Sequence, residues 1–91
     1  MQKISRKGLI KLNFVHAEYN PMYNSIDVTH YDGYILRFDC NIIESSLKLT
    51  PGSQCSVNAL AIDEPLQYVT MYLEGSFQSW IDCEENQIVN N

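Results

Sequence analysis

The residues best suited to chemistry are two histidines and three cysteines. His16 and His30 fall on the apolar faces of two alternating segments that we expect to pair as a hairpin, and Cys40 follows the next such segment. A metal site needs three or four ligands in fixed geometry, and the chain has neither a His-x-x-x-His nor a Cys-x-x-Cys spacing. A nucleophilic pair of Cys40 with His30 lacks a recognisable orienting group. We therefore expect no metal, no cofactor and no catalytic residue, so the chain is predicted not to be an enzyme.

The remaining small motifs exclude further classes. Cys40, Cys55 and Cys83 are odd in number and widely spaced, which is typical of reduced structural thiols. The four glycines are isolated, so no phosphate-binding loop is present. No apolar run reaches the roughly 18–20 residues of a membrane span, and the basic start is not followed by a secretory signal. We expect a cytoplasmic protein that does not contact membranes.

Charge is distributed unevenly along the chain. Residues 1–48 hold all six cations and five anions, whereas residues 49–91 hold six anions and no cation. The anions of the second half are Asp63, Glu64, Glu74, Asp82, Glu84 and Glu85. Since this half cannot neutralise its own carboxylates locally, it should project negative potential that repels nucleic acid and attracts basic protein surfaces. The alternative is that these anions only aid solubility, with Asp63 and Glu64 also serving a helix N-terminus.

Tyrosine is the other candidate for partner binding. The chain has six tyrosines, more than a core of this size needs, and tyrosine is favoured on surfaces that are both apolar and wet. Tyr19, Tyr23 and Tyr31 fall in or beside predicted turns, where burial is difficult. We expect an exposed aromatic patch for a protein partner, with ordinary packing at the edge of the core as the alternative. The basic N-terminal residues are too few to predict direct nucleic-acid binding.

The elements that position these residues begin with three strands. Alternating apolar residues predict strands over 9–17, 26–30 and 34–39. Asn and Pro in residues 19–24 predict a turn after the first strand, and Asp32-Gly33 predicts a tight hairpin after the second. The segment 40–48 is consistent with either a fourth short strand or a turn of helix. The three strands form an antiparallel meander that needs an apolar cover on one face.

Helices in the second half are expected to supply that cover. We predict a helix over 54–62 with Ser53 as its N-cap, and a helix that starts after an Asp63 N-cap and stops at Gly75. Residues 76–81 are predicted to form a short helical turn, and 84–91 a polar, partly frayed tail. With 91 residues, the chain is expected to be one domain, residues 1–91, with a mobile basic start over 1–8. The predicted class is α+β, a meander covered on one face by two or three short C-terminal helices.

Two motifs resemble a family of small bacterial proteins of unknown function. They are Asp39-Cys40 followed by Ile43-Glu44, and the run from Asp63 to Val69 that leads to Leu73-Glu74-Gly75, so the likeness covers about residues 22–82. No activity comes with this resemblance. It implies a bacterial setting, often associated with phages or mobile elements. Small acidic proteins of such settings include inhibitors of host nucleases. An anti-CRISPR role is therefore a hypothesis that rests on this association and not on any particular residue.

These observations lead to a ranked pair of functional hypotheses. The first is a non-enzymatic protein-binding module, an inhibitor of the anti-CRISPR type, whose acidic residues and neighbouring tyrosines engage a basic surface on a nucleic-acid-handling protein. The second is a small structural or regulatory domain that associates with itself, through the meander edge or a helix face, as a homodimer.

Overall fold

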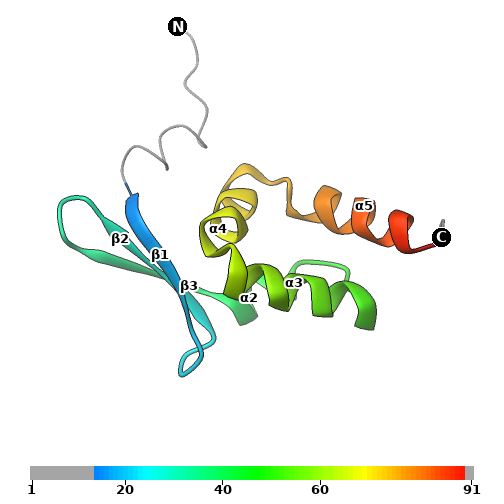
Figure 1. Cartoon of the computed structure of the whole chain (residues 1–91), viewed down its shortest axis with the longest axis horizontal. Helices are drawn as coiled ribbons and strands as arrows, with labels where there is room; N and C mark the ends of the chain where they lie inside the picture. Colours follow the sequence, from blue (N-terminus) through cyan, green and yellow to red (C-terminus); the bar gives the residue numbers. More distant parts are fainter. Residues whose placement is uncertain (1–13, 90–91) are drawn as a thin grey trace, which may run out of the picture.

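The structure is a computed structural model that describes residues 14–89, with side chains as far as Glu85. In this part of the chain three strands precede four helices (Figure 1): β1 (Phe14–Asn20), β2 (Ser25–His30), β3 (Ile35–Asp39), α2 (Cys40–Ser45), α3 (Pro51–Asp63), α4 (Pro65–Glu74) and α5 (Phe77–Val89). The predicted α+β class, a three-stranded antiparallel meander followed by helices, is confirmed. The basic start and residues 9–13 of the first predicted strand lie outside the described residues.

The sheet has the order β1-β2-β3, with β2 in the centre. Ile26 and Val28 of β2 are fully buried and share the face that the helices cover. Their cross-strand partners are Tyr19 and Ala17 in β1 and Phe38 and Leu36 in β3. The burial of these apolar residues fixes the register of the three strands, because a shift of one strand by one residue would turn its apolar side chains toward solvent.

Both predicted turns are present, although the first is shorter than expected. β1 continues through Asn20, so Tyr19 lies in the strand and not in the turn as predicted. The chain then reverses over 21–24, where Asn24 adopts a φ of 50°. Asn tolerates this left-handed conformation better than most residues. At the second turn Gly33 has a φ of 103° and donates its N–H to the carbonyl of His30, as the Asp-Gly pair predicts.

The ambiguous segment after β3 is a helix. Asp39 ends β3 and caps α2, because its carboxylate accepts the N–H of Asn41 at 2.8 Å and that of Ile42 at 3.3 Å. Cys40 and Ile43 lie on the buried face of α2. A local cap therefore joins the strand directly to the helix.

Two predicted helix starts were wrong. α3 begins at Pro51 with Thr50 as its N-cap, and Ser53, the predicted cap, is the third helical residue. Thr50 and Ser53 form a reciprocal capping box, in which each hydroxyl accepts the other residue's backbone N–H. Asp63, the predicted cap of the next helix, is the last residue of α3, and Glu64 precedes Pro65 without a side-chain cap.

The end of α4 is as predicted, whereas α5 is longer than predicted. Gly75 closes α4 with a φ of 76°, and its N–H bonds to the last turn of that helix. α5 then runs to Val89, so residues 77–89 of the expected short turn and polar tail belong to one helix of 13 residues. Phe77 and Ile81 bury its first turns, and the carboxylate of Glu85 accepts a hydrogen bond from Thr50 at the start of α3. These contacts extend the helix beyond the point suggested by composition.

The buried residues form one cluster between the sheet and the helices. α4 contacts both β1 and β2, and it lies between the sheet and the pair α3 and α5 (Figure 1). Tyr68, the largest fully buried side chain, packs edge-on against Phe77 with ring centroids 4.9 Å apart. None of the helices within residues 14–89 combines the length and the apolar character that crossing a membrane requires.

Candidate functional site

The ends of α3 and α5 form a shallow groove that collects three predicted site residues. Asp63 and Glu64 follow each other at the α3–α4 junction, and Glu84 lies in the second half of α5. Together with Trp80 and Leu60 they line a hollow of about 280 Å³, whose remaining walls are Ser56 and Ala59. The floor is largely apolar and the rim carries carboxylates. Residues twenty positions apart in the chain thus meet because α3 and α5 pack against each other.

The carboxylates of this groove have no partners among the described residues. The side chains of Asp63, Glu64 and Glu84 make no hydrogen bond or ion pair within the described part of the chain. Asp63 and Glu64 are exposed, and Glu84 is half-buried. Carboxylates without a partner are available to another protein, and an apolar floor beside them lowers the local dielectric, which strengthens their attraction for a cation.

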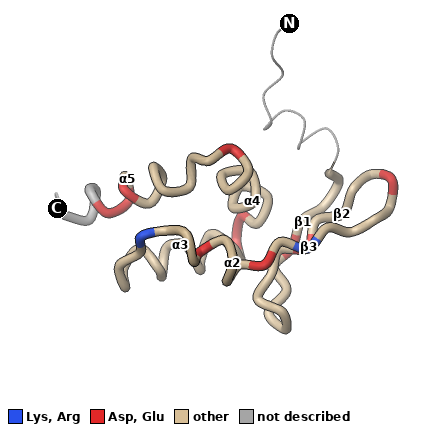
Figure 2. Tube along the Cα trace, turned by 180° about the vertical axis from the view of Figure 1, so that it is seen from behind, with Lys and Arg blue, Asp and Glu red and all other residues tan. Residues whose placement is uncertain are grey.

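The described residues as a whole are strongly acidic. Residues 14–89 contain eleven carboxylates and only two cations, a formal charge of −9 (Figure 2). The cations are Arg37 and Lys48, and neither lines the groove. Arg37 is already paired, because its Nε lies 3.0 Å from the carboxylate of Asp27. The charge of the groove is therefore uncompensated by any neighbouring side chain that the structure describes.

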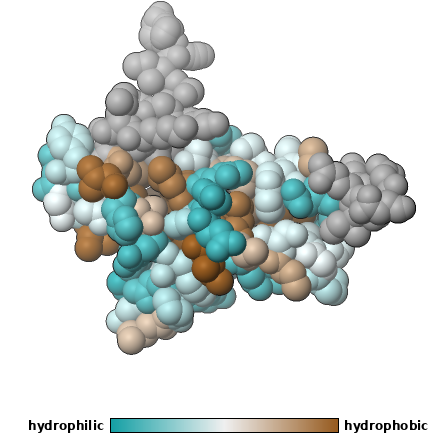
Figure 3. All heavy atoms as spheres, viewed as in Figure 1, coloured by the Kyte–Doolittle hydropathy of each residue, from teal (hydrophilic) through white to brown (hydrophobic). Residues whose placement is uncertain are grey.

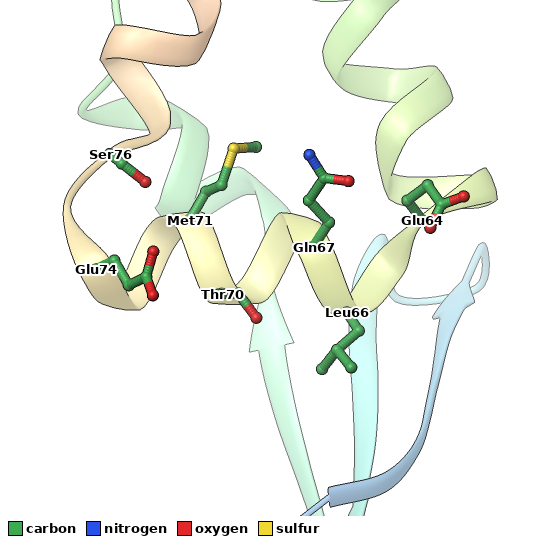
Figure 4. A pocket seen from close by; sticks show the side chains of 7 residues that line it. All are labelled: Glu64, Leu66, Gln67, Thr70, Met71, Glu74 and Ser76. Atoms are coloured by element: carbon green, nitrogen blue, oxygen red, sulfur yellow. The ribbon is translucent and has the colours of Figure 1, made fainter. Parts of the chain in front are cut away.

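The other three acidic candidates lie elsewhere. Glu85 and Asp82 are engaged within the fold: Glu85 accepts from Thr50, and Asp82 accepts from Gln78 at 3.1 Å. Glu74 is exposed at the far end of α4 and lines a second hollow, of about 430 Å³, together with Glu64. Figure 4 shows these two glutamates at opposite ends of α4 with Gln67 and Met71 between them. The structure therefore divides the six acidic candidates among several surfaces.

The three candidate tyrosines do not form one patch. Tyr19 is half-buried, and its hydroxyl donates to the side-chain oxygen of Asn24 at 2.8 Å. Tyr23 is exposed at the same end of the sheet, where its ring lies 4.1 Å from the guanidinium of Arg37. Tyr31 is exposed at the opposite end, in the β2–β3 hairpin, stacked on His30. The length of β2 separates Tyr31 from the other two.

The pairings of His30 with Cys40 and with His16, which the sequence did not favour, are absent among the described residues. His30 ends β2, whereas Cys40 follows the end of β3 that pairs with the start of β2, so they lie at opposite ends of the sheet. His30 is sandwiched between Tyr31 and Tyr34, and its Nδ1 accepts the backbone N–H of Asp32 at 3.0 Å. His16 lies on the other face of the sheet and contacts Glu18. No group of three metal-binding side chains occurs among the described residues.

A buried polar cluster links α2, α3 and α4, and sequence reasoning did not single it out. The hydroxyl of the fully buried Tyr68 donates to Glu44 at 2.5 Å, and the same carboxyl group accepts from Gln54 at 2.9 Å. The thiol of Cys40 lies against the Tyr68 hydroxyl, and burial raises the pKa of both groups above their ordinary values. Cys40, Glu44 and Tyr68 belong to the two motifs that resemble the family of unknown function. These motifs were therefore the feature of the sequence that could have indicated the cluster. Their observed role here is structural.

A second cluster orders the uncovered face of the sheet. Asp27, in the centre of β2, accepts hydrogen bonds from Asn20, Ser25 and Arg37. The hydrogen bond with Arg37 is the main reason that the pKa of Asp27 lies below its ordinary value, and it raises the pKa of Arg37 in turn. The cluster holds the three strands together on the side that no described helix covers.

These features define a small α+β protein with an acidic helical groove, an uncovered sheet face and no recognisable catalytic constellation among the described residues. The chain belongs to a family of unknown function, DUF6061, whose model matches residues 12–90. This membership confirms the resemblance found in the sequence. No curated protein and no solved structure shows a significant match to the chain.

Proposed function

We propose that the chain is a protein-binding module that uses the groove between α3 and α5 to engage a basic surface on another protein. The observation that supports this proposal is the meeting of three carboxylates, from Asp63, Glu64 and Glu84, around the half-buried ring of Trp80, none of them paired with a side chain that the structure describes. In the sequence these groups are separated, and only the packing of α3 against α5 gathers them.

The chemistry of the groove suits an arginine or lysine side chain of the partner. The apolar floor of Leu60 and Trp80 accommodates the methylene stem of such a side chain, and the rim carboxylates pair with its charged head. The Trp80 ring adds a cation–π surface, which guanidinium groups use more often than ammonium groups. We therefore expect arginine to be favoured over lysine at this contact.

A narrower form of the proposal identifies the partner as a nucleic-acid-handling protein that this chain inhibits, as an anti-CRISPR protein does. The net negative charge of the described residues supports it, since surfaces that bind nucleic acid are basic and attract carboxylates as they attract phosphates. Inhibition would then be competitive, with the chain occupying the surface that nucleic acid needs.

Affinity capture tests the proposal when the charge change is matched. The test variant carries Asp63→Asn, Glu64→Gln and Glu84→Gln. The control variant removes the same charge from Glu18, Asp32 and Glu74, which do not line the groove. Tagged wild type and both variants are incubated with a lysate of the source cells at about 0.15 M and about 0.5 M salt, and captured proteins are quantified by mass spectrometry.

The expected result is a basic protein that the wild type and the control variant retain and that the groove variant and high salt release. Equal loss with both variants would show that only total charge matters and would overturn the role of the groove. Retention by the groove variant would refute the proposal outright. For the narrower form, a captured nuclease must lose activity on addition of the wild type and recover it with excess nucleic acid.

A further inference from the structure

The open edge of β3 is the least protected edge of the sheet. β1, the other edge strand, carries a bulge between Phe14 and His16 and contacts α3 and α4. β3 has no proline, no bulge and no lysine, which are the devices that usually block strand pairing at an edge. Its one cation, Arg37, is held against β2 by Asp27.

Within residues 14–89, the outward backbone groups on this edge have no partner. His30 of β2 donates its N–H to the carbonyl of Tyr34 at 2.9 Å. The backbone groups of the even-numbered residues on the β3 side of this pairing therefore form their hydrogen bonds with β2. The alternation of an antiparallel pair then turns the N–H and C=O of Ile35 and Arg37 outward. Neither residue has a backbone partner on that side within the described part of the chain.

Apolar side chains accompany this open edge. Ile35 is 61% exposed, Tyr34 51% and Leu36 38%. Figure 1 shows the β2–β3 hairpin extending past the helices, and Figure 3 shows apolar atoms at the surface over this part of the sheet. Tyr34 and Leu36 point to the helix-covered face yet remain exposed there, because the described helices do not reach this end of the sheet.

From these features we infer that β3 pairs antiparallel with β3 of a second copy, across a two-fold axis at Leu36, to form a continuous six-stranded sheet. In an antiparallel pair, two residues directly opposite each other point to the same face of the sheet. The two-fold axis must therefore pass through the position of one residue, because an axis between two residues would pair side chains of opposite faces. At Leu36 it places Leu36 opposite its own copy, Tyr34 opposite Phe38, and Ile35 opposite Arg37. Each Ile35–Arg37 pair then exchanges both backbone hydrogen bonds through the free edge groups.

The axes at the next two residues of the strand are less favourable. An axis at Arg37 places two guanidinium groups directly opposite each other, which destabilises a cross-strand pair. An axis at Phe38 places Cys40 opposite Leu36, but Cys40 is already the first residue of α2 and has left the extended conformation. The self-complementary arrangement at Leu36 favours a second copy as the occupant over an unrelated strand. This inference concerns a different surface from the α3–α5 groove and does not depend on it.

Substitutions at Ile35 test both the dimer and its register. This side chain lies on the uncovered face of the sheet, so its replacement leaves the core intact. Relative to Ile35→Gln, we expect Ile35→Glu to tighten the dimer and Ile35→Lys to weaken it, because residue 35 faces Arg37. Each dimer contains two such pairs of residue 35 with Arg37. Together they should lower the dissociation constant of the glutamate variant, and raise that of the lysine variant, by roughly 2- to 30-fold. General repulsion between acidic chains predicts the opposite order, since the lysine variant is the least negative.

Sedimentation equilibrium over a concentration series measures these constants, with circular dichroism as the check that each variant is folded. The wild type should approach twice the chain mass of 10.5 kDa. A monomer at every concentration would overturn the inference and leave the edge for a strand of another protein. A dimer that responds equally to glutamate and lysine would place the interface elsewhere and overturn it as well.

A disulfide scan provides an independent measure of the register. In a background with Cys55→Ser and Cys83→Ser, only the buried Cys40 remains. Leu36→Cys then places the two introduced thiols directly opposite each other across the axis. The two residues form a non-hydrogen-bonded pair, in which the Cα atoms are about 4.5 Å apart, so mild oxidation should cross-link the dimer. Ile35→Cys in the same background sets its two copies diagonally, beyond the ~7 Å reach of a disulfide. Cross-linking of the second variant alone would refute the register.

Discussion

Replacing Tyr68 by Phe should destabilise the fold through one hydrogen bond. Tyr68 is fully buried, and its hydroxyl donates to Glu44 at 2.5 Å. Phenylalanine keeps the ring and its edge-on contact with Phe77, so no large cavity forms. The loss is that of a hydrogen bond to a carboxyl group, about 1.5–3 kcal/mol, and the lower part of this range applies because Gln54 still donates to Glu44. For a domain of this size, about 1.5–2 kcal/mol lowers the melting temperature by roughly 6–16 °C.

Urea unfolding followed by the fluorescence of Trp80, the single tryptophan, measures this change. Tyr72→Phe is the matched control, because it removes the same hydroxyl from a residue that is 41% exposed and whose hydroxyl makes no hydrogen bond among the described residues. We expect the control to lie within about 0.5 kcal/mol of the wild type. Equal stabilities for the two variants would refute the role of the buried cluster. A double-mutant cycle with Glu44→Gln then isolates the pairwise energy.

Three other predictions concern charge, backbone and thiols. Because the hydrogen bond with Arg37 lowers the folded-state pKa of Asp27, this carboxylate stabilises the fold above its unfolded pKa near 4 and loses that contribution as the pH falls through the folded pKa. Asp27→Asn should therefore cost stability at pH 7 in urea unfolding, and the cost should shrink as the pH is lowered below about 4. Gly75→Ala should lower the free energy of unfolding by about 1–2 kcal/mol in the same assay, because residue 75 has a φ of 76°. Gly52→Ala, inside α3, is the control and should cost no stability. Equal effects of the two substitutions would contradict this prediction. Of the three cysteines, Cys40 should resist alkylation in the folded state while the two exposed ones react, as peptide mass spectrometry would show; rapid labelling of Cys40 would contradict the buried cluster.

Local signals in the sequence predicted the sheet well. The alternation of apolar residues in β2 and β3 and the Asp-Gly pair at the second turn act between near neighbours, so they predicted both the strands and their antiparallel order. Gly75 likewise ends α4 because few other residues adopt its backbone conformation.

Helix starts were predicted less well, because several residues of one segment can cap. Thr50 and Ser53 both have capping hydroxyls, and each uses its hydroxyl in the same box. Asp63 has the chemistry of an N-cap, but packing extends α3 through it and leaves Glu64 at the junction. The choice among such residues depends on where the helix meets the core, which composition does not record.

For the candidate site, the sequence by itself determined the excess of carboxylates in the second half, the absence of cation partners there, and the local turns and stops of the fold. Only the tertiary structure decided which carboxylates meet, since Glu84 reaches Asp63 and Glu64 through the packing of α5 on α3 while Asp82 and Glu85 bind within the fold. The structure also separated Tyr31 from the other candidate tyrosines. Residue types and short-range periodicity are written in the chain, whereas proximity between distant residues follows from the burial of apolar faces against one another.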